Sequence, residues 1–330
     1  MKRTRMFTTA AIALAATLAL SSCGGKRENT PAAEGGDSCT AASGQITIAT
    51  GNSTGVYYVL GGGLAQVISS NTELKATAAE TGASVQNLQQ LASGDYDIAF
   101  SLADTAADAV SGNGSFEQPE ELSALTRIYD NFTHVIVRKD ANIDSIEDFK
   151  GKTISTGSPK SGTEVIANRL IESAGLKEGD VTAQRLDLSK TVDGMKDGTI
   201  DGMVWSGGLP TAGVTDLFTS NGNDVELLDI SDLEAPMKEI NPVYEVAEIS
   251  AETYKGAGAV ETIVTPNVLM VRNDMDEGTA CALTKLIFDQ KAELEKVHAA
   301  AKEINVDTAE APDPITLHPG SQKALEELQK

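Results

Sequence analysis

Three segments of the chain combine glycine with small hydroxyl residues, a composition that suits close contact with a small oxyanion. They are 50–55 (Thr-Gly-Asn-Ser-Thr-Gly), 81–84 (Thr-Gly-Ala-Ser) and 157–163 (Gly-Ser-Pro-Lys-Ser-Gly-Thr). Each precedes a predicted helix, whose N-terminus exposes unpaired backbone N–H groups and the positive end of its dipole. Glycine lets a ligand approach such a backbone closely. We therefore expect a site for a carboxylate or a similar anion, with tight turns that bind nothing as the alternative.

Motifs for other kinds of chemistry are missing from the sequence. Neither 50–55 nor 157–163 has the Gly-x-x-x-x-Gly-Lys-Ser/Thr pattern of a nucleoside triphosphate site. The chain has no His-Glu-x-x-His motif, and its cysteines and three histidines lack metal-ligand spacing. We expect no cofactor, no metal site and no catalysis, although an enzyme stays open as an alternative.

The elements that must position these segments are repeated along the chain. A β-like run at 46–50 leads into the first segment and a helix over about 56–69, and a run at 152–156 leads into the third segment and another helix. An apolar-x-x-apolar-x-x-Gly-x-x-Asp pattern ends at Asp97 and again at Asp201, each time before a short strand. This repetition predicts an α/β fold with two lobes and a cleft that closes about a hinge.

Composition narrows the possible partners. The chain has 330 residues, of which 41% are apolar, and a formal net charge of −22. This length can fill two lobes, while the strong acidity disfavours a nucleic acid or an anionic membrane surface as partner. No apolar stretch reaches the roughly 18–20 residues that a membrane-spanning helix needs. We therefore expect neither a nucleic-acid-binding protein nor an integral membrane protein.

The N-terminus has the features of a bacterial export signal. Lys2, Arg3 and Arg5 precede a short apolar core, and Leu-Ser-Ser before Cys23 resembles the lipobox, in which the cysteine becomes acylated. An ordinary cleaved signal peptide with a chance cysteine is the alternative. We expect residues 1–22 to be a signal peptide and 23–44 a flexible tether. A lipid on Cys23 would hold the protein to the extracytoplasmic face of the cell membrane, or in the periplasm if an outer membrane is present.

Two further cysteines, Cys39 and Cys281, remain once Cys23 is assigned to the lipid. An exported protein lies in an oxidising compartment, where such residues can form a disulfide. Because Cys39 and Cys281 lie far apart in the sequence, the sequence does not define the distance between them in the folded protein. A disulfide and two separate thiols are both compatible with the sequence.

Several ordered segments resemble the TAXI family, the solute-binding proteins of TRAP transporters. These segments are 50–62, 81–88, 91–97, 157–164 and 317–320. The resemblance implies a type II periplasmic-binding-protein fold, in which crossover strands act as the hinge between two α/β lobes. We expect one lobe at 45–137 and 246–330 and the other at 138–245.

The resemblance also implies a function. Members of the family bind small carboxylates, such as glutamate or other dicarboxylic acids, and deliver them to an ion-gradient-driven TRAP permease. We expect a monomer that does the same. A substrate-binding lipoprotein of an ABC importer has the same fold and is the main alternative.

The loops and the resemblance together predict the residues that bind the ligand. They are Thr54, Gly55, Tyr57, Ser84, Asn87, Asp104, Lys160, Ser161, Gly162, Thr163 and Trp205. Some of these residues have structural roles as alternatives, since Thr54 and Ser84 can cap helices and Lys160 can be an exposed surface residue. The chain departs from the family at Leu102, Ala107 and Lys160, where glutamine, tyrosine and glycine are usual. These departures leave the identity of the ligand open.

Overall fold

The computed structural model describes residues 39–177 and 179–330. These residues form an α/β fold around a ten-stranded sheet with the strand order β2-β1-β3-β10-β4-β7-β5-β6, while β8 pairs with β4 and β9 with β10. The strands are β1 (Gly44–Ala49), β2 (Leu74–Ala79), β3 (Ile98–Leu102), β4 (Leu122–Arg138), β5 (Thr153–Ser155), β6 (Thr182–Gln184), β7 (Gly202–Gly207), β8 (Val225–Leu227), β9 (Glu245–Ile249) and β10 (Val260–Arg272). The predicted fold class is confirmed.

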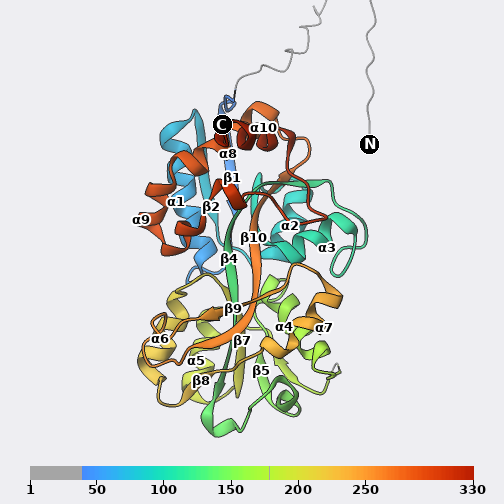
Figure 1. Cartoon of the computed structure of the whole chain (residues 1–330), viewed down its shortest axis with the longest axis vertical. Helices are drawn as coiled ribbons and strands as arrows, with labels where there is room; N and C mark the ends of the chain where they lie inside the picture. Colours follow the sequence, from blue (N-terminus) through green and yellow to red (C-terminus); the bar gives the residue numbers. More distant parts are fainter. Residues whose placement is uncertain (1–38, 178) are drawn as a thin grey trace, which may run out of the picture. The chain divides into compact units, whose positions relative to one another are not determined.

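Helices cover the two ends of this sheet and define two lobes (Figure 1). The first lobe, around β1–β3, carries α1 (Val56–Asn71), α2 (Ser84–Ala92), α3 (Ala103–Ser111), α8 (Glu277–Asp289), α9 (Lys291–Val297) and α10 (Pro319–Leu328). The second lobe, around β5–β7, carries α4 (Gly162–Ser173), α5 (Leu188–Asp197), α6 (Ala212–Asn221) and α7 (Glu234–Ile240). Short 3-10 helices lie at Lys139–Ala141, Ile146–Phe149, Ser231–Leu233, Ala299–Glu303 and Val306–Thr308.

The two lobes share a local plan. β1 pairs in parallel with β2 and β3, as β5 does with β6 and β7. Gly94 and Gly198 end the helix before β3 and β7 with φ of 84° and 71°, values that favour glycine. The carboxylates of Asp97 and Asp201 then each accept a hydrogen bond of 2.8 Å from a backbone N–H of the neighbouring parallel strand. The repeated sequence pattern thus builds the same helix-turn-strand corner in each lobe.

Two long strands connect the lobes. β4 and β10 are antiparallel neighbours, and their register shifts between Pro266 and Val268 and again between Leu269 and Met270. β10 also pairs with β3 of the first lobe, whereas β4 also pairs with β7 of the second. These are the crossover strands, and the proline and register shifts interrupt their ladder between the lobes.

The lobe boundaries differ from the expected ones. Ile249 and Tyr254, expected in the first lobe, pack in the same apolar core as α5 and α6 of the second. Val135 and Val137 near the end of β4 likewise pack in the core against α4. The reason is that β9 folds back onto the beginning of β10, and each long strand contributes to both cores. The second lobe therefore begins within β4 and ends within β10.

A disulfide joins Cys39 to Cys281 of α8, with their Cα atoms 4.9 Å apart, a usual separation for disulfides. It ties the segment before β1 to the first lobe. The predicted signal peptide, Cys23 and the tether up to residue 38 lie outside the described residues. Within the described part of the chain, no helix is both long enough and apolar enough to cross a membrane.

Candidate ligand-binding site

A cavity of about 30 Å³ lies between the two lobes. Space of this size holds about two water molecules. Of the residues predicted from the sequence, the structure places these along its wall: Gly55, Tyr57, Ser84, Ser161, Gly162, Thr163 and Trp205. Thr54, Asn87, Asp104 and Lys160 do not line it.

Three helices begin at the cavity, namely α1 and α2 of the first lobe and α4 of the second. Gly55 and Ala83, the N-cap residues of α1 and α2, provide no side-chain cap, and neither helix has an acidic residue in its first turn. Ser161 caps α4 by accepting a 3.0 Å hydrogen bond from the Glu164 N–H. First-turn N–H groups have no partner within their own helix, so the three helix starts direct N–H groups and positive dipole ends toward the cavity.

The loops that carry these helix starts contact each other across the cleft. The Asn52 side chain donates to Ser158 Oγ at 3.2 Å, and the Gln86 N–H donates to the Lys160 carbonyl at 3.0 Å. Ala83 and Lys160 have φ of 82° and 62°, in a region that residues other than glycine rarely adopt. Strained backbone is therefore concentrated where the lobes meet.

Gly162 marks the closest approach of α4 to the first lobe. A Cβ atom at this position would lie 2.5 Å from Leu102 Cδ1 and 2.7 Å from Ser84 Oγ. Ser84 Oγ in turn accepts a 3.1 Å hydrogen bond from the Leu102 N–H at the end of β3. Only a residue without a side chain lets α4 come this close.

Two hydroxyl groups in the cavity wall have no hydrogen-bond partner among the described residues. They are Tyr129 OH, on β4, and Ser206 Oγ, on β7, and their residues are only 1% and 6% exposed. Buried polar groups are nearly always paired, so an unpaired hydroxyl on a residue that lines a cavity indicates a missing partner. A bound ligand would provide that partner.

The crossover strands carry a cluster of polar residues that the sequence did not predict. Tyr57 OH donates to Asn267 Oδ1, and Asn267 Nδ2 donates to the Tyr129 carbonyl at 3.1 Å and to Asn131 Oδ1 at 2.9 Å. Burial raises the pKa of Tyr57 and of Tyr129 well above the usual value, so both phenols stay neutral. The available signal was an asparagine in the middle of each long, largely apolar strand.

Asn87 and Thr54 differ from their predicted roles. Asn87 is fully buried, and its Nδ2 donates to the carbonyls of Thr50 and Phe100 at 2.6 and 2.9 Å. Its Oδ1 accepts from the Thr81 hydroxyl at 2.6 Å, so the amide joins the ends of β1 and β3 and has no group left for a ligand. The Thr54 hydroxyl is buried away from the cavity.

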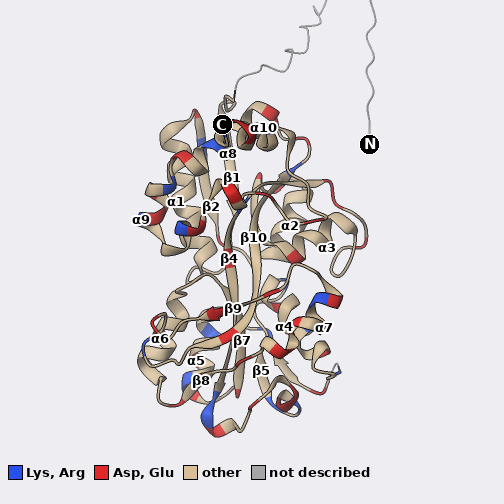
Figure 2. Cartoon of the chain, in the orientation of Figure 1, with Lys and Arg blue, Asp and Glu red and all other residues tan. Residues whose placement is uncertain are grey.

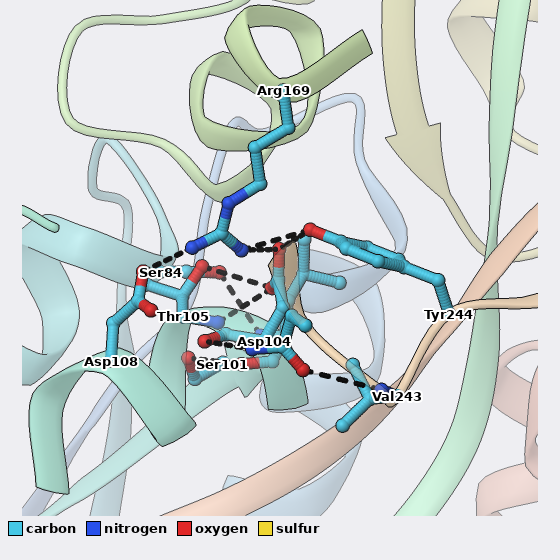
Figure 3. A network of polar contacts seen from close by, with 10 residues as sticks. Ser84, Ser101, Asp104, Thr105, Asp108, Arg169, Val243 and Tyr244 are labelled. Atoms are coloured by element: carbon cyan, nitrogen blue, oxygen red, sulfur yellow. Dashed lines mark hydrogen bonds and ion pairs between the residues drawn. The ribbon is translucent and has the colours of Figure 1, made fainter. Parts of the chain in front are cut away.

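The two predicted charged residues do not reach the cavity either. Lys160 is exposed, and its Nζ donates to Gln89 Oε1 at 3.0 Å. Asp104 is buried at the start of α3, where Oδ2 accepts from Arg169 Nη1 at 3.0 Å and from Tyr244 OH at 2.5 Å (Figure 3). Arg169 Nη2 also pairs with Asp108 at 2.7 Å. Asp104 thus belongs to an ion-pair network that joins α3 of the first lobe to α4 of the second.

This network contains two carboxylates for one guanidinium. Burial and the neighbouring Asp104 raise the pKa of Asp108, although Arg169 opposes that shift. For Arg169, burial disfavours the charge, but Asp104, Tyr244 and Asp108 outweigh it and raise the pKa. The Arg169 guanidinium and the two carboxylates therefore stabilise each other's charged forms.

Trp205 is held by a buried chain of hydrogen bonds. Its Nε1 donates to Thr211 Oγ1 at 3.2 Å, and the Thr211 N–H donates to Tyr254 OH at 2.9 Å. Tyr254 OH lies 2.8 Å from Nε2 of His134, which is fully buried on β4. Burial lowers the pKa of His134 to about 4.

Stability should therefore fall on acidification. Below pH 6.5 the unfolded chain protonates this histidine, whereas the folded chain resists until about pH 4. The lost stability approaches about 3 kcal/mol at pH 4, at about 1.4 kcal/mol per pKa unit. Urea unfolding of His134→Gln at pH 7.5 and pH 4.5 should show a smaller loss than that of the unchanged chain. Equal losses in the two proteins would refute the assignment.

Acidic and basic residues are distributed over the helices and loops of both lobes (Figure 2). Among the described residues that line the cavity, none is charged. Because the whole chain carries a net charge of −22, an anion must be held there by local donors against the overall field.

Comparison with known proteins gives a family and a fold. The profile of the NMT1-like family matches residues 48–328. Similar solved structures include the binding-protein component of a phosphonate ABC transporter from Pseudomonas aeruginosa, at 14% identity and a TM-score of 0.57, covering 87% of this chain and 85% of that one. A Bordetella bronchiseptica protein matches at 20% identity and a TM-score of 0.54, over 86% and 88% of the two chains. A Xanthomonas citri protein solved with ATP matches at 14% and 0.51, over 86% and 95%.

Proposed function

The chain belongs to the NMT1-like family, and we propose that it is an extracytoplasmic solute-binding protein that captures a small carboxylate between its lobes. The observation that carries this proposal is the convergence of the starts of α1, α2 and α4 on one cavity. Helix N-termini are common anion sites, and here they come from both lobes. Binding without turnover is the role this arrangement supports.

The available donors are sufficient for useful affinity. Each hydrogen bond to a charged group contributes about 1.5–3 kcal/mol, and micromolar binding corresponds to about 8 kcal/mol. About three to six bonds from the helix starts therefore suffice. Because the donors come from both lobes, only the closed arrangement offers all of them to one ligand, so binding would favour closure.

We propose that the membrane partner is a TRAP permease driven by an ion gradient and that the protein acts as a monomer. The resemblance of segments 50–62 and 157–164 to the TAXI family supports this partner. The alternative is an ABC importer, because the similar Pseudomonas aeruginosa structure is named as part of one. Uptake of the bound solute in vesicles should require an ion gradient for a TRAP permease and internal ATP for an ABC importer.

Lipid attachment through Cys23 is a further part of this proposal. Several acyl chains, at about 0.8 kcal/mol per buried CH₂, hold a protein at a membrane without a spanning helix. Cys23→Ala should therefore move the protein from the membrane fraction to the soluble fraction after cell disruption. Membrane association that survives this substitution would count against lipid anchoring.

Ligand binding can be tested on the cavity wall. Thr163 Oγ1 accepts a 3.2 Å hydrogen bond from the Ser206 N–H, which leaves the hydroxyl hydrogen available for an anion. We expect small carboxylates, but not neutral sugars, to raise the melting temperature, and Thr163→Val to weaken their binding about tenfold in calorimetry. Stabilisation by sugars alone would overturn the proposal.

A further inference from the structure

The uncharged wall of the cavity restricts the kind of carboxylate that fits. We propose that the ligand is a small monoanion with one carboxylate and one neutral oxygen group, an inference that rests on the proposed function. It would carry neither an ammonium group nor a second acidic group. This excludes the glutamate-like and dicarboxylic ligands that the family resemblance implied.

No charged side chain at the cavity can compensate a further charge on the ligand. A second carboxylate would need a cation and an ammonium group would need an anion, because an uncompensated buried charge costs several kcal/mol. The two candidates for these roles are engaged elsewhere, Lys160 with Gln89 and Asp104 with Arg169 and Tyr244. The described lining residues offer no charged side chain at all.

The number of helix N-termini at the cavity also limits the negative charge that the ligand can carry. Each helix N-terminus is equivalent to about half a unit of positive charge, so three of them roughly compensate one carboxylate. Glu164 in the first turn of α4 reduces this potential, since α4 is the one of the three with an acidic first turn. A dianion would thus be poorly compensated.

Two hydroxyl groups that lack partners among residues 39–177 and 179–330 indicate a neutral oxygen on the ligand. Tyr129 on β4 and Ser206 on β7 both line the cavity, outside the three helix starts, and their hydroxyl groups are buried. A hydroxyl can both donate and accept, so the pair suits a hydroxy or keto oxygen on the ligand.

A matched panel of three-carbon compounds tests this inference. Titration calorimetry of the full-length protein, in detergent and after extensive dialysis, would compare lactate, pyruvate, propionate, alanine and malonate. Lactate or pyruvate should bind best, propionate about tenfold more weakly, and alanine and malonate at least a hundredfold more weakly.

Two variants and a control locate the neutral subsite. Ser206→Ala and Tyr129→Phe should each weaken lactate or pyruvate binding about tenfold and leave propionate binding unchanged. Thr133→Val is the control, because the Thr133 hydroxyl is also buried and has no partner in the described part of the chain, but Thr133 does not line the cavity. This control should leave the affinities for lactate or pyruvate and for propionate unchanged.

The outcomes separate this inference from the proposed function. Malonate or alanine binding as tightly as lactate and pyruvate would overturn the inference and leave carboxylate capture intact. Failure of every monoanion, with binding of a neutral solute instead, would overturn both. Unchanged affinity in Ser206→Ala and Tyr129→Phe would overturn the neutral subsite alone.

Discussion

Replacing Arg169 by methionine is expected to lower the free energy of unfolding by about 3–5 kcal/mol, the usual cost of removing one partner from a buried ion pair. Arg169 compensates Asp104, which is fully buried, and Asp108 at 2.7 Å. Without the guanidinium, two carboxylates would share a poorly hydrated site at the junction of α3 and α4. Urea unfolding at pH 7.5 measures the loss.

A surface pair provides the control for this prediction. Lys238 pairs with Glu234 at 2.7 Å, but the two side chains are 42% and 36% exposed, so Lys238→Met should cost less than about 1 kcal/mol. Adding Asp104→Asn and Asp108→Asn to Arg169→Met should recover much of the loss, because no buried charge remains. A loss for Arg169→Met no larger than that for Lys238→Met would show that the network is not needed for stability.

Gly162→Ala is expected to weaken ligand binding by about tenfold to a hundredfold. The added Cβ would meet Leu102 and Ser84 of the first lobe, so it would oppose closure. Overpacking of this kind costs about 1–3 kcal/mol, and relieving it would move the start of α4 away from α2 and separate the donors that hold the ligand. Within α4 itself alanine is well tolerated.

Gly62→Ala is the matched control for this substitution. Gly62 lies in α1, and a Cβ there would meet no atom within 4 Å. The change should raise the free energy of unfolding by about 0.5–1 kcal/mol and leave affinity unchanged. Calorimetry compares the ligand affinities of Gly162→Ala and Gly62→Ala, and equal affinities would mean that the lobes do not close at Gly162.

The loops that begin the helices were predictable because their chemistry is local. Gly55, Ser161 and Gly162 act through backbone N–H groups and short side chains, and a strand followed by a glycine-rich turn and a helix places such groups at the edge of a sheet. The repeated pattern that ends at Asp97 and at Asp201 also indicated that the two lobes share one plan.

Other parts of the site depend on contacts between distant segments. Asn87 lies one turn into α2, where its side chain faces the ends of β1 and β3 rather than the helix start. Asp104 meets Arg169 only after the two lobes come together. Tyr129 lies on a strand buried along most of its length, so no alternation of polar and apolar residues marks which side chains face the cavity.

Native mass spectrometry of the full-length protein, purified without denaturation from its own cells, tests the central claim most directly. The account predicts that one small monoanionic acid accompanies each chain and is lost from Gly162→Ala prepared in the same way. A neutral solute in its place, or an acid retained undiminished by Gly162→Ala, would contradict the assignment of the cavity between the lobes as the binding site.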